Sequence, residues 1–292
     1  MSQGPLTDGL VVRPDWLVRV ERAGLMRIDV DVVRIGDIAV GRRYTGNGRS
    51  GVPWVFVHGL GEDSASWAAQ LSAMGETRPA FAVDVRGHGR TDLGRADGTL
   101  RQLARDLVGF LGTVGPSVCV GFSMGGAVVL AAAALAPDLV EHVVPVCTSS
   151  VVGARAAERF RTRADGIEAE GAEFARASLS ENLSANVLSW PVDWEEQLAS
   201  RLTAIGDGKG YANAARAMAS MHEDPLTPRL ADVRAPVDVF IGERDTSCPW
   251  RAGEIIVGAV PDGRCHLLPG VGHFVNIERP DVLTEALMKL RR

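Results

Sequence analysis

The amino-acid sequence predicts an α/β fold built on a mostly parallel central sheet. Short, almost continuous apolar runs bounded by turn residues are typical of strands covered on both faces. Six such runs follow one another, at 52–57, 80–85, 118–120, 143–146, 237–241 and 265–268. Stretches with helical spacing separate several of these runs, at 64–74, 99–114 and 124–135, and another closes the chain at 280–290. Alternation of strand and helix indicates a doubly wound sheet flanked by helices.

The first element of this fold is a predicted β-hairpin. Segments 26–33 and 37–44 alternate and are rich in β-branched residues, and Gly36 lies in the turn between them. The preceding residues, 1–24, are interrupted by Gly4, Pro5, Gly9 and Pro14, and we interpret them as an N-terminal extension.

The regular alternation stops in segment 151–232, which is too long for a loop without structure of its own. It is rich in Ala and Glu, and its apolar residues recur at near-helical spacing. We therefore predict a helical cap at 151–232, inserted into a core that comprises 25–150 and 233–292.

Composition limits the partners of the chain. Its 292 residues are 46% hydrophobic and 23% charged, which is typical of a globular protein. The 31 basic and 36 acidic residues give a net charge of −5, so no basic excess is present to bind nucleic acid. The longest apolar stretch, 127–136, is far shorter than the roughly 20 residues that span a membrane. We expect neither nucleic acid nor membrane as a partner, and the sequence leaves the oligomeric state open.

Cysteines and other ligand residues show no pattern of a disulfide framework or a metal site. The four cysteines are scattered and form no C-x-x-C pair, and the first thirty residues carry several acidic residues and no secretory apolar run. These features predict a cytoplasmic protein. Since no H-E-x-x-H, clustered Cys/His or phosphate-binding motif occurs, we expect neither a metal nor a cofactor.

The strongest chemical signal is a G-x-S-x-G motif at 121–125. It joins the strand at 118–120 to the apolar helix at 124–135, and this strand–turn–helix setting is what gives the motif its meaning. Such a turn presents the Ser123 hydroxyl above the sheet at a helix N-terminus, where backbone N–H groups favour developing negative charge. Ser123 is therefore the predicted nucleophile.

A serine nucleophile needs a base and an acid that orients the base. Asp245 follows the strand at 237–241, and His273 follows the strand at 265–268. The chain order Ser, Asp, His is the one that accompanies G-x-S-x-G. Glu243 is the rival acid, although Asp245 lies deeper in the loop. The other five histidines are interpreted as structural or surface residues, with His222 kept as a candidate for the substrate pocket: His58, His88, His142, His222 and His266.

A tetrahedral intermediate also requires two donors for its oxyanion. The backbone N–H of Met124, directly after the nucleophile, is the first predicted donor. The second comes from the loop after the strand at 52–57, which reads His-Gly-Leu-Gly at 58–61, and we assign it to the N–H of Leu60.

Together these motifs resemble the α/β-hydrolase superfamily. The resemblance rests on His58 to Gly61 with Trp67, on Asp-Val-Arg-Gly-His-Gly at 84–89, on the elbow at 121–126, on 242–245 and on Gly272-His273. It extends from about residue 26 to the C-terminus. It implies an eight-stranded, mostly parallel sheet with an antiparallel second strand and a cap inserted after the sixth. Serine at position 123 distinguishes the chain from the dehalogenase and epoxide-hydrolase branches, which use a carboxylate nucleophile.

The sequence thus predicts a serine hydrolase acting on a small carboxylic ester, lactone or related acyl compound. C–C bond hydrolase, thioesterase and perhydrolase activities share the same triad and stay open, as does a lyase or ligand receptor on the same scaffold. The cap residues Trp190 and Trp194 are predicted, with His222, to contact a hydrophobic substrate, because such pockets are mainly apolar.

Overall fold

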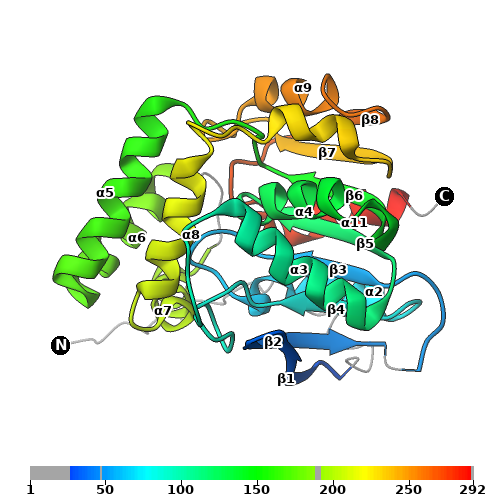
Figure 1. Cartoon of the computed structure of the whole chain (residues 1–292), viewed down its shortest axis with the longest axis horizontal. Helices are drawn as coiled ribbons and strands as arrows, with labels where there is room; N and C mark the ends of the chain where they lie inside the picture. The colour runs from blue at the N-terminus through cyan, green and yellow to red at the C-terminus, as the bar shows by residue number, and fades with distance from the viewer. Residues whose placement is uncertain (1–26, 47, 188–191, 291–292) are drawn as a thin grey trace, which may run out of the picture.

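The structure, a computed structural model, describes residues 27–46, 48–187 and 192–290. Within these residues, eight strands form one sheet in the order β1-β2-β4-β3-β5-β6-β7-β8 (Figure 1). The strands are β1 Asp29–Ile35, β2 Ile38–Thr45, β3 Trp54–Val57, β4 Ala80–Val83, β5 Ser117–Phe122, β6 Val140–Val146, β7 Val237–Gly242 and β8 Gly263–Leu268. The predicted N-terminal extension, 1–24, lies outside the described residues.

The sheet is parallel except at its second strand. β2 pairs antiparallel with β1, in a register that joins Ile35 to Ile38, and antiparallel with β4 on its other side. From β4 to β8 every pairing is parallel. The predicted hairpin, the mostly parallel sheet and the antiparallel second strand are therefore confirmed.

Helices cover both faces of the sheet. The core helices are α2 Ala68–Gly75, α3 Leu100–Val114, α4 Met124–Leu135, α9 Trp250–Val257, α10 Val275–Glu278 and α11 Pro280–Lys289. One apolar cluster joins the sheet to α3, α4 and α9, and a second joins the opposite face to α2 and α11. α4 carries no polar or charged side chain and is buried along most of its length, as expected of a helix surrounded by protein.

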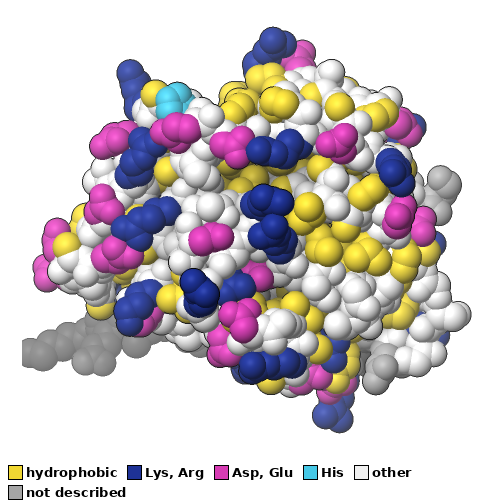
Figure 2. All heavy atoms as spheres, viewed as in Figure 1, with side chains coloured by type: hydrophobic (Ala, Val, Ile, Leu, Met, Phe, Trp, Pro, Cys, Tyr) yellow, Lys and Arg dark blue, Asp and Glu magenta, His cyan; other side chains and the backbone are white. Residues whose placement is uncertain are grey.

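In the described residues, four α-helices lie between β6 and β7, and they stand to one side of the sheet in Figure 1. They are α5 Ala154–Glu170, α6 Ala172–Asn186, α7 Trp194–Ile205 and α8 Lys209–Ser220, and all four fall inside the segment interpreted as a cap. Asp193 caps α7 by accepting a hydrogen bond from the Glu196 N–H at 3.0 Å. Basic and acidic side chains are interspersed over α5 and α8 on the face shown in Figure 2. Arg216 of α8 pairs with Asp165 and Glu168 of α5.

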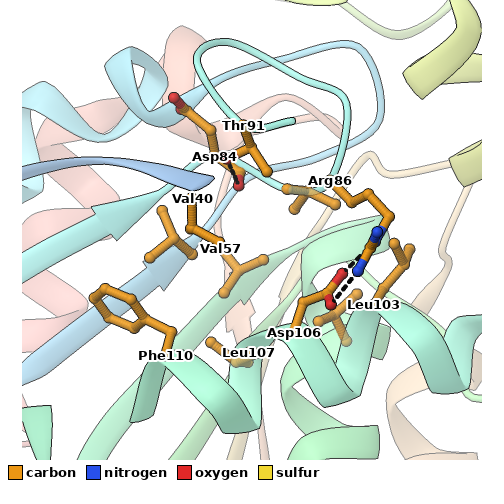
Figure 3. Close-up of a pocket in the computed structure, with 12 residues that line it drawn as sticks. Val40, Val57, Asp84, Arg86, Thr91, Leu103, Asp106, Leu107 and Phe110 are labelled. Carbon is orange, nitrogen blue, oxygen red and sulfur yellow. Dashed lines mark hydrogen bonds and ion pairs between the residues drawn. The ribbon is translucent and has the colours of Figure 1, made fainter. Parts of the chain in front are cut away.

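A small internal cavity lies between the sheet and α3 (Figure 3). Its volume is about 20 Å³, and Val57, Leu107 and Phe110 line it beside the bidentate ion pair of Arg86 with Asp106. A space of this size holds about one water molecule. The cavity is therefore a packing defect of the core and too small for a substrate.

The segment 84–89 holds the loop beside the carboxyl ends of the strands. Asp84 accepts hydrogen bonds from the Ser64 N–H at 2.7 Å and the Arg90 N–H at 3.0 Å. His88 is fully buried, its Nδ1 lies 3.2 Å from the Arg86 carbonyl oxygen, and burial lowers its pKa to about 3. The folded chain therefore keeps this imidazole neutral well below the pH at which a free histidine takes up a proton.

This buried imidazole predicts acid sensitivity. Because the pKa of His88 is lower in the folded chain than the unfolded value of 6.5, its contribution to stability is full above pH 6.5. It falls as pH drops toward 3, by up to about 1.4 kcal/mol per pH unit. His88→Asn keeps a donor for the Arg86 carbonyl and removes the titration. Urea unfolding from pH 8 to pH 4 should show a smaller loss for the variant than for the wild type. Parallel curves would contradict the prediction.

Candidate active site

The turn between β5 and α4 holds Ser123 in a strained backbone conformation. Its φ is 50° and its ψ is −115°, a region that a non-glycine residue rarely adopts. The flanking glycines are required by close backbone approach. A Cβ added to Gly121 would lie 2.1 Å from the carbonyl oxygen of Gly125. A Cβ added to Gly125 would lie 2.2 Å from the carbonyl oxygen of Val57. The sequence at 121–125 is therefore dictated by the sharpness of this turn.

Two hydrogen bonds from the neighbouring strand end hold this turn in place. The Ser123 N–H donates to the Val146 carbonyl at 2.9 Å, and the Thr148 hydroxyl donates to the Ser123 carbonyl at 2.6 Å. Both peptide groups of Ser123 are thus bound to the end of β6. This attachment offsets backbone strain that costs about 1–3 kcal/mol at such positions.

The structure brings the three residues predicted as a triad together. His273 Nε2 lies 3.1 Å from Ser123 Oγ, and His273 Nδ1 lies 2.9 Å from Asp245 Oδ2. Asp245 and His273 are buried. Both distances are within hydrogen-bond reach, the geometry required of a nucleophile, a base and the group that orients the base. When the Nδ1–H donates to Asp245 Oδ2, the imidazole presents an unprotonated Nε2 to the serine hydroxyl.

Two backbone donors orient Asp245. The N–H groups of Ser247 and Cys248 each donate to Asp245 Oδ1 at 2.8 Å, which leaves Oδ2 for His273. The rival acid Glu243 is exposed and accepts a hydrogen bond from the Gly270 N–H at 2.7 Å. Of the two carboxylates in this loop, Asp245 is therefore the one bonded to the imidazole.

The other histidines have separate partners. His58 is buried, accepts from the Val85 N–H at 2.9 Å through Nε2, and therefore donates through Nδ1 to the Gly59 carbonyl at 2.8 Å. His142 and His266 bond to Asp238, which ties β6, β7 and β8 together. His222 lies exposed after α8, with Nδ1 3.1 Å from the Val152 carbonyl oxygen. Among the described contacts, none joins His222 to the triad.

The two predicted oxyanion donors lie at the ends of adjacent parallel strands. Met124 is the first residue of α4, where the N–H has no partner within the helix, and Leu60 lies in the loop after β3. β3 and β5 pair directly, with Val57 opposite Gly121. Gly59 lies against the Phe122 ring, since an added Cβ there would be 2.7 Å from it. The loop at 58–61 therefore packs beside the serine turn.

The cap contacts this loop through apolar side chains. An added Cβ at Gly61 would lie 3.1 Å from a Leu179 methyl group of α6 and 3.2 Å from the Tyr211 ring of α8. Trp194, the first residue of α7, is half-buried against the same apolar cluster. Trp190 lies outside the described residues. Leu179 and Tyr211 thus place apolar groups of the cap against Gly61 of this loop.

Three residues around the triad were not singled out by the sequence analysis. The Phe122 ring lies 5.2 Å from the His273 ring and 5.9 Å from the Phe274 ring. Glu62, in the loop after β3, forms an ion pair with Arg201 of α7 in the cap, and their side chains are only 4% and 3% exposed. The position of Phe122 inside G-x-S-x-G was a possible clue, whereas nothing near Arg201 in the sequence points to Glu62.

One group of potential metal ligands occurs in the described part of the chain, Asp245, Cys248 and His273, whose ligand atoms lie within 4.8 Å of one another. Both carboxylate oxygens of Asp245 already accept hydrogen bonds. Burial raises the pKa of the Cys248 thiol well above its ordinary value, and a protonated thiol is a poor ligand. These residues fit a hydrogen-bonded acid–base pair better than a metal centre.

A model of the alpha/beta hydrolase family matches residues 54–286, which is well over half of the chain. The chain belongs to this family. Membership confirms the predicted resemblance, and with hydrolase-named relatives it confirms the prediction of an α/β-hydrolase-type enzyme. In the described residues of this family member, no helix is long and apolar enough to cross a membrane.

Two relatives and one solved structure to which the chain is similar carry the names of a hydrolase or a lactonase. The 2-(acetamidomethylene)succinate hydrolase of Mesorhizobium japonicum is 26% identical over 263 residues, 87% of this chain and 92% of that protein. The 3-oxoadipate enol-lactonase 1 of Acinetobacter baylyi is 24% identical over 229 residues, 78% of this chain and 84% of that protein. The crystal structure of the enol-lactonase from Burkholderia xenovorans matches with a TM-score of 0.77 at 25% identity, over 90% of this chain and 100% of that chain.

Proposed function

We propose that this chain is a serine hydrolase that cleaves a small, hydrophobic carboxylic ester or lactone through an acyl-enzyme. The observation that carries the proposal is the pair of bonds made by His273, 3.1 Å to Ser123 Oγ and 2.9 Å to Asp245 Oδ2. A strained serine at a helix N-terminus, a buried imidazole and a buried carboxylate are what nucleophilic acyl transfer requires.

The proposed reaction has two halves. Ser123 Oγ attacks the substrate carbonyl carbon while His273 Nε2 takes the hydroxyl proton, and Asp245 stabilises the resulting imidazolium. The tetrahedral intermediate collapses as His273 returns the proton to the leaving alkoxide. Water then attacks the acyl-enzyme with His273 again as the base, which releases the carboxylic acid and restores the Ser123 hydroxyl.

The oxyanion of both intermediates is assigned to the backbone N–H groups of Leu60 and Met124. Met124 opens α4, so the positive end of the helix dipole adds to its N–H. The carbonyl oxygen of Gly59 accepts from His58 Nδ1 at 2.8 Å and from the Glu62 N–H at 3.2 Å. Because a trans peptide is planar, these two bonds also set the direction of the Leu60 N–H on the opposite side.

The proposed substrate class rests on the cap and on the relatives. Leu179 and Tyr211 contact the loop at 58–61 and favour an apolar acyl or alcohol group. Lactone hydrolysis is the activity named for two of the relatives. We infer a cytoplasmic location from the cysteines, since Cys119, Cys147, Cys248 and Cys265 are all free thiols.

A panel of substrates tests this proposal. It contains nitrophenyl esters of increasing acyl length, aryl esters, lactones and thioesters, with Ser123→Ala as the control. We expect serine-dependent turnover and a preference for uncharged, apolar acyl groups over short charged ones. A preference for charged esters would contradict the proposed pocket. Absence of turnover on the whole panel, with folded protein confirmed by circular dichroism, would favour C–C cleavage, elimination or ligand sensing instead.

A further inference from the structure

A buried ion pair connects the cap to the loop that carries Leu60. Arg201 of α7 donates from its Nη2 to Glu62 Oε1 at 2.7 Å, and both side chains are more than nine-tenths buried. Burying two charges is costly unless their remaining polar atoms are also bonded. The other partners of Glu62 and Arg201 therefore indicate what this pair holds.

Glu62 bonds to both the N–H and the carbonyl group of Gly59 in the turn at 59–62. Its Oε2 accepts from the Gly59 N–H at 3.2 Å, and its own N–H donates to the Gly59 carbonyl at 3.2 Å. The Gly59 N–H is thereby occupied and unavailable to a substrate. The carboxylate thus holds the His58–Gly59 peptide, while the bond to the Gly59 carbonyl orients the next peptide, Gly59–Leu60, and with it the Leu60 N–H.

Arg201 adds a contact from the cap to the same turn, because its Nη1 lies 3.5 Å from the Leu60 carbonyl oxygen. Both peptide groups of Leu60 are thus flanked by this network: Glu62 binds the group before Leu60, and Arg201 approaches the group after it.

The His273 loop and the helix α10 that directly follows it bind the same network. Asn276 donates from Nδ2 to both Glu62 oxygens, at 3.3 and 3.2 Å. The Arg201 guanidinium lies 4.5 Å from the centre of the Phe274 ring, and that ring contacts the His273 ring edge-on at 5.3 Å. Three segments far apart in the sequence therefore meet at one buried pair: the Leu60 loop, the His273 loop and α7.

We propose that Arg201 is a positioning residue of the cap that, through Glu62, holds the Leu60 donor and the His273 loop in their reactive arrangement. This inference rests on the proposed serine hydrolase function, and it assigns the cap a part in the chemistry besides lining the substrate pocket. A buried pair that only stabilises the fold is the alternative, and it makes different predictions.

The decisive comparison uses the double variant Arg201→Met/Glu62→Gln. Methionine replaces the guanidinium over the Phe274 ring with an apolar side chain, and glutamine keeps the shape of Glu62 and can still accept from the Gly59 N–H. The ion pair that ties this turn to α7 is lost. Each single variant leaves one buried polar group without its partner, so each should unfold at a lower temperature than the wild type. The double variant should recover most of that loss, since replacing both members of a buried pair is often neutral.

Catalysis should not recover with stability. For a nitrophenyl ester that the wild type cleaves, we expect the folded double variant to keep KM and lose about 10²-fold in kcat, the effect of misplacing one oxyanion donor. Affinity for an aryl trifluoromethyl ketone, which forms a tetrahedral adduct with the serine, should fall by a similar factor. Full recovery of kcat together with stability would overturn the proposal and leave the pair a purely structural one.

A matched control comes from the cap surface. Arg176 of α6 pairs with Glu195 of α7 at 3.2 Å, and both side chains are largely exposed. Arg176→Met removes a cap arginine and its ion pair without touching the buried network, and it should leave kcat unchanged. An equal loss in this control would show that any change in cap charge lowers activity, and would contradict the specific role of Arg201.

Amide hydrogen exchange separates this inference from the proposed function. In the double variant, faster exchange confined to 58–62 and 273–277 supports the positioning role, even if the wild type cleaves none of the esters. Unchanged exchange in both segments would overturn it. If the wild type shows no Ser123-dependent turnover, that result contradicts the proposed function and does not affect the interpretation of the exchange experiment.

Discussion

Ser123→Ala is expected to lower kcat by at least about 10⁴-fold for any ester that the wild type hydrolyses. The substitution removes the only atom proposed to bond covalently to the substrate. Activity does not vanish, because the oxyanion donors and substrate binding still act on a water molecule. The Ser123 backbone keeps its bonds to Val146 and Thr148, so thermal unfolding should change little.

Steady-state kinetics and labelling with a fluorophosphonate probe check this prediction together. The wild type should be labelled at a single site and Ser123→Ala at none. Thr148→Ser is a control beside the serine turn, because it keeps the hydroxyl that bonds to the Ser123 carbonyl. Near wild-type turnover in Ser123→Ala would refute the acyl-enzyme mechanism.

Asp245→Asn is expected to lower kcat by about 10⁴-fold, similar to the loss known for this change in other triads. The N–H groups of Ser247 and Cys248 both point at Oδ1, so the asparagine carbonyl takes that position and its NH₂ group faces His273 Nδ1. A donor there forces the imidazole proton onto Nε2. The imidazole then donates to Ser123 Oγ and cannot accept the hydroxyl proton.

The kcat of Asp245→Asn, measured across pH, tests this tautomer argument. Activity should rise at high pH, where hydroxide replaces the missing base, while the unfolding temperature stays close to that of the wild type. Glu243→Gln is the matched control in the same loop, because its exposed carboxylate bonds only to the Gly270 N–H among the described contacts. A similar loss in both variants would contradict the assignment of Asp245 as the orienting acid.

Sequence alone predicted the fold class, the hairpin and the positions of Ser123, Asp245 and His273, because these depend on local rules. Apolar runs mark buried parallel strands, and the carboxyl ends of such strands meet at one edge of the sheet. Residues that directly follow strands, as Asp245 and His273 nearly do, are therefore brought together wherever the chain order allows. The elbow glycines are equally local, since the clashes they avoid lie within or beside the turn.

Cap contacts were decided only by the tertiary structure. His222, which the sequence analysis considered for the substrate pocket, lies exposed and is bonded to the Val152 carbonyl. Arg201, which the sequence analysis did not single out, is buried against Glu62, a residue that lies 139 positions away in the chain. Asn276 reaches the same carboxylate from 214 positions away. No periodicity or motif links residues at such separations, because which helix face is buried depends on the packing of the cap onto the core. Local geometry determined the proposed reacting groups, and long-range packing decided which side chains we propose to hold them.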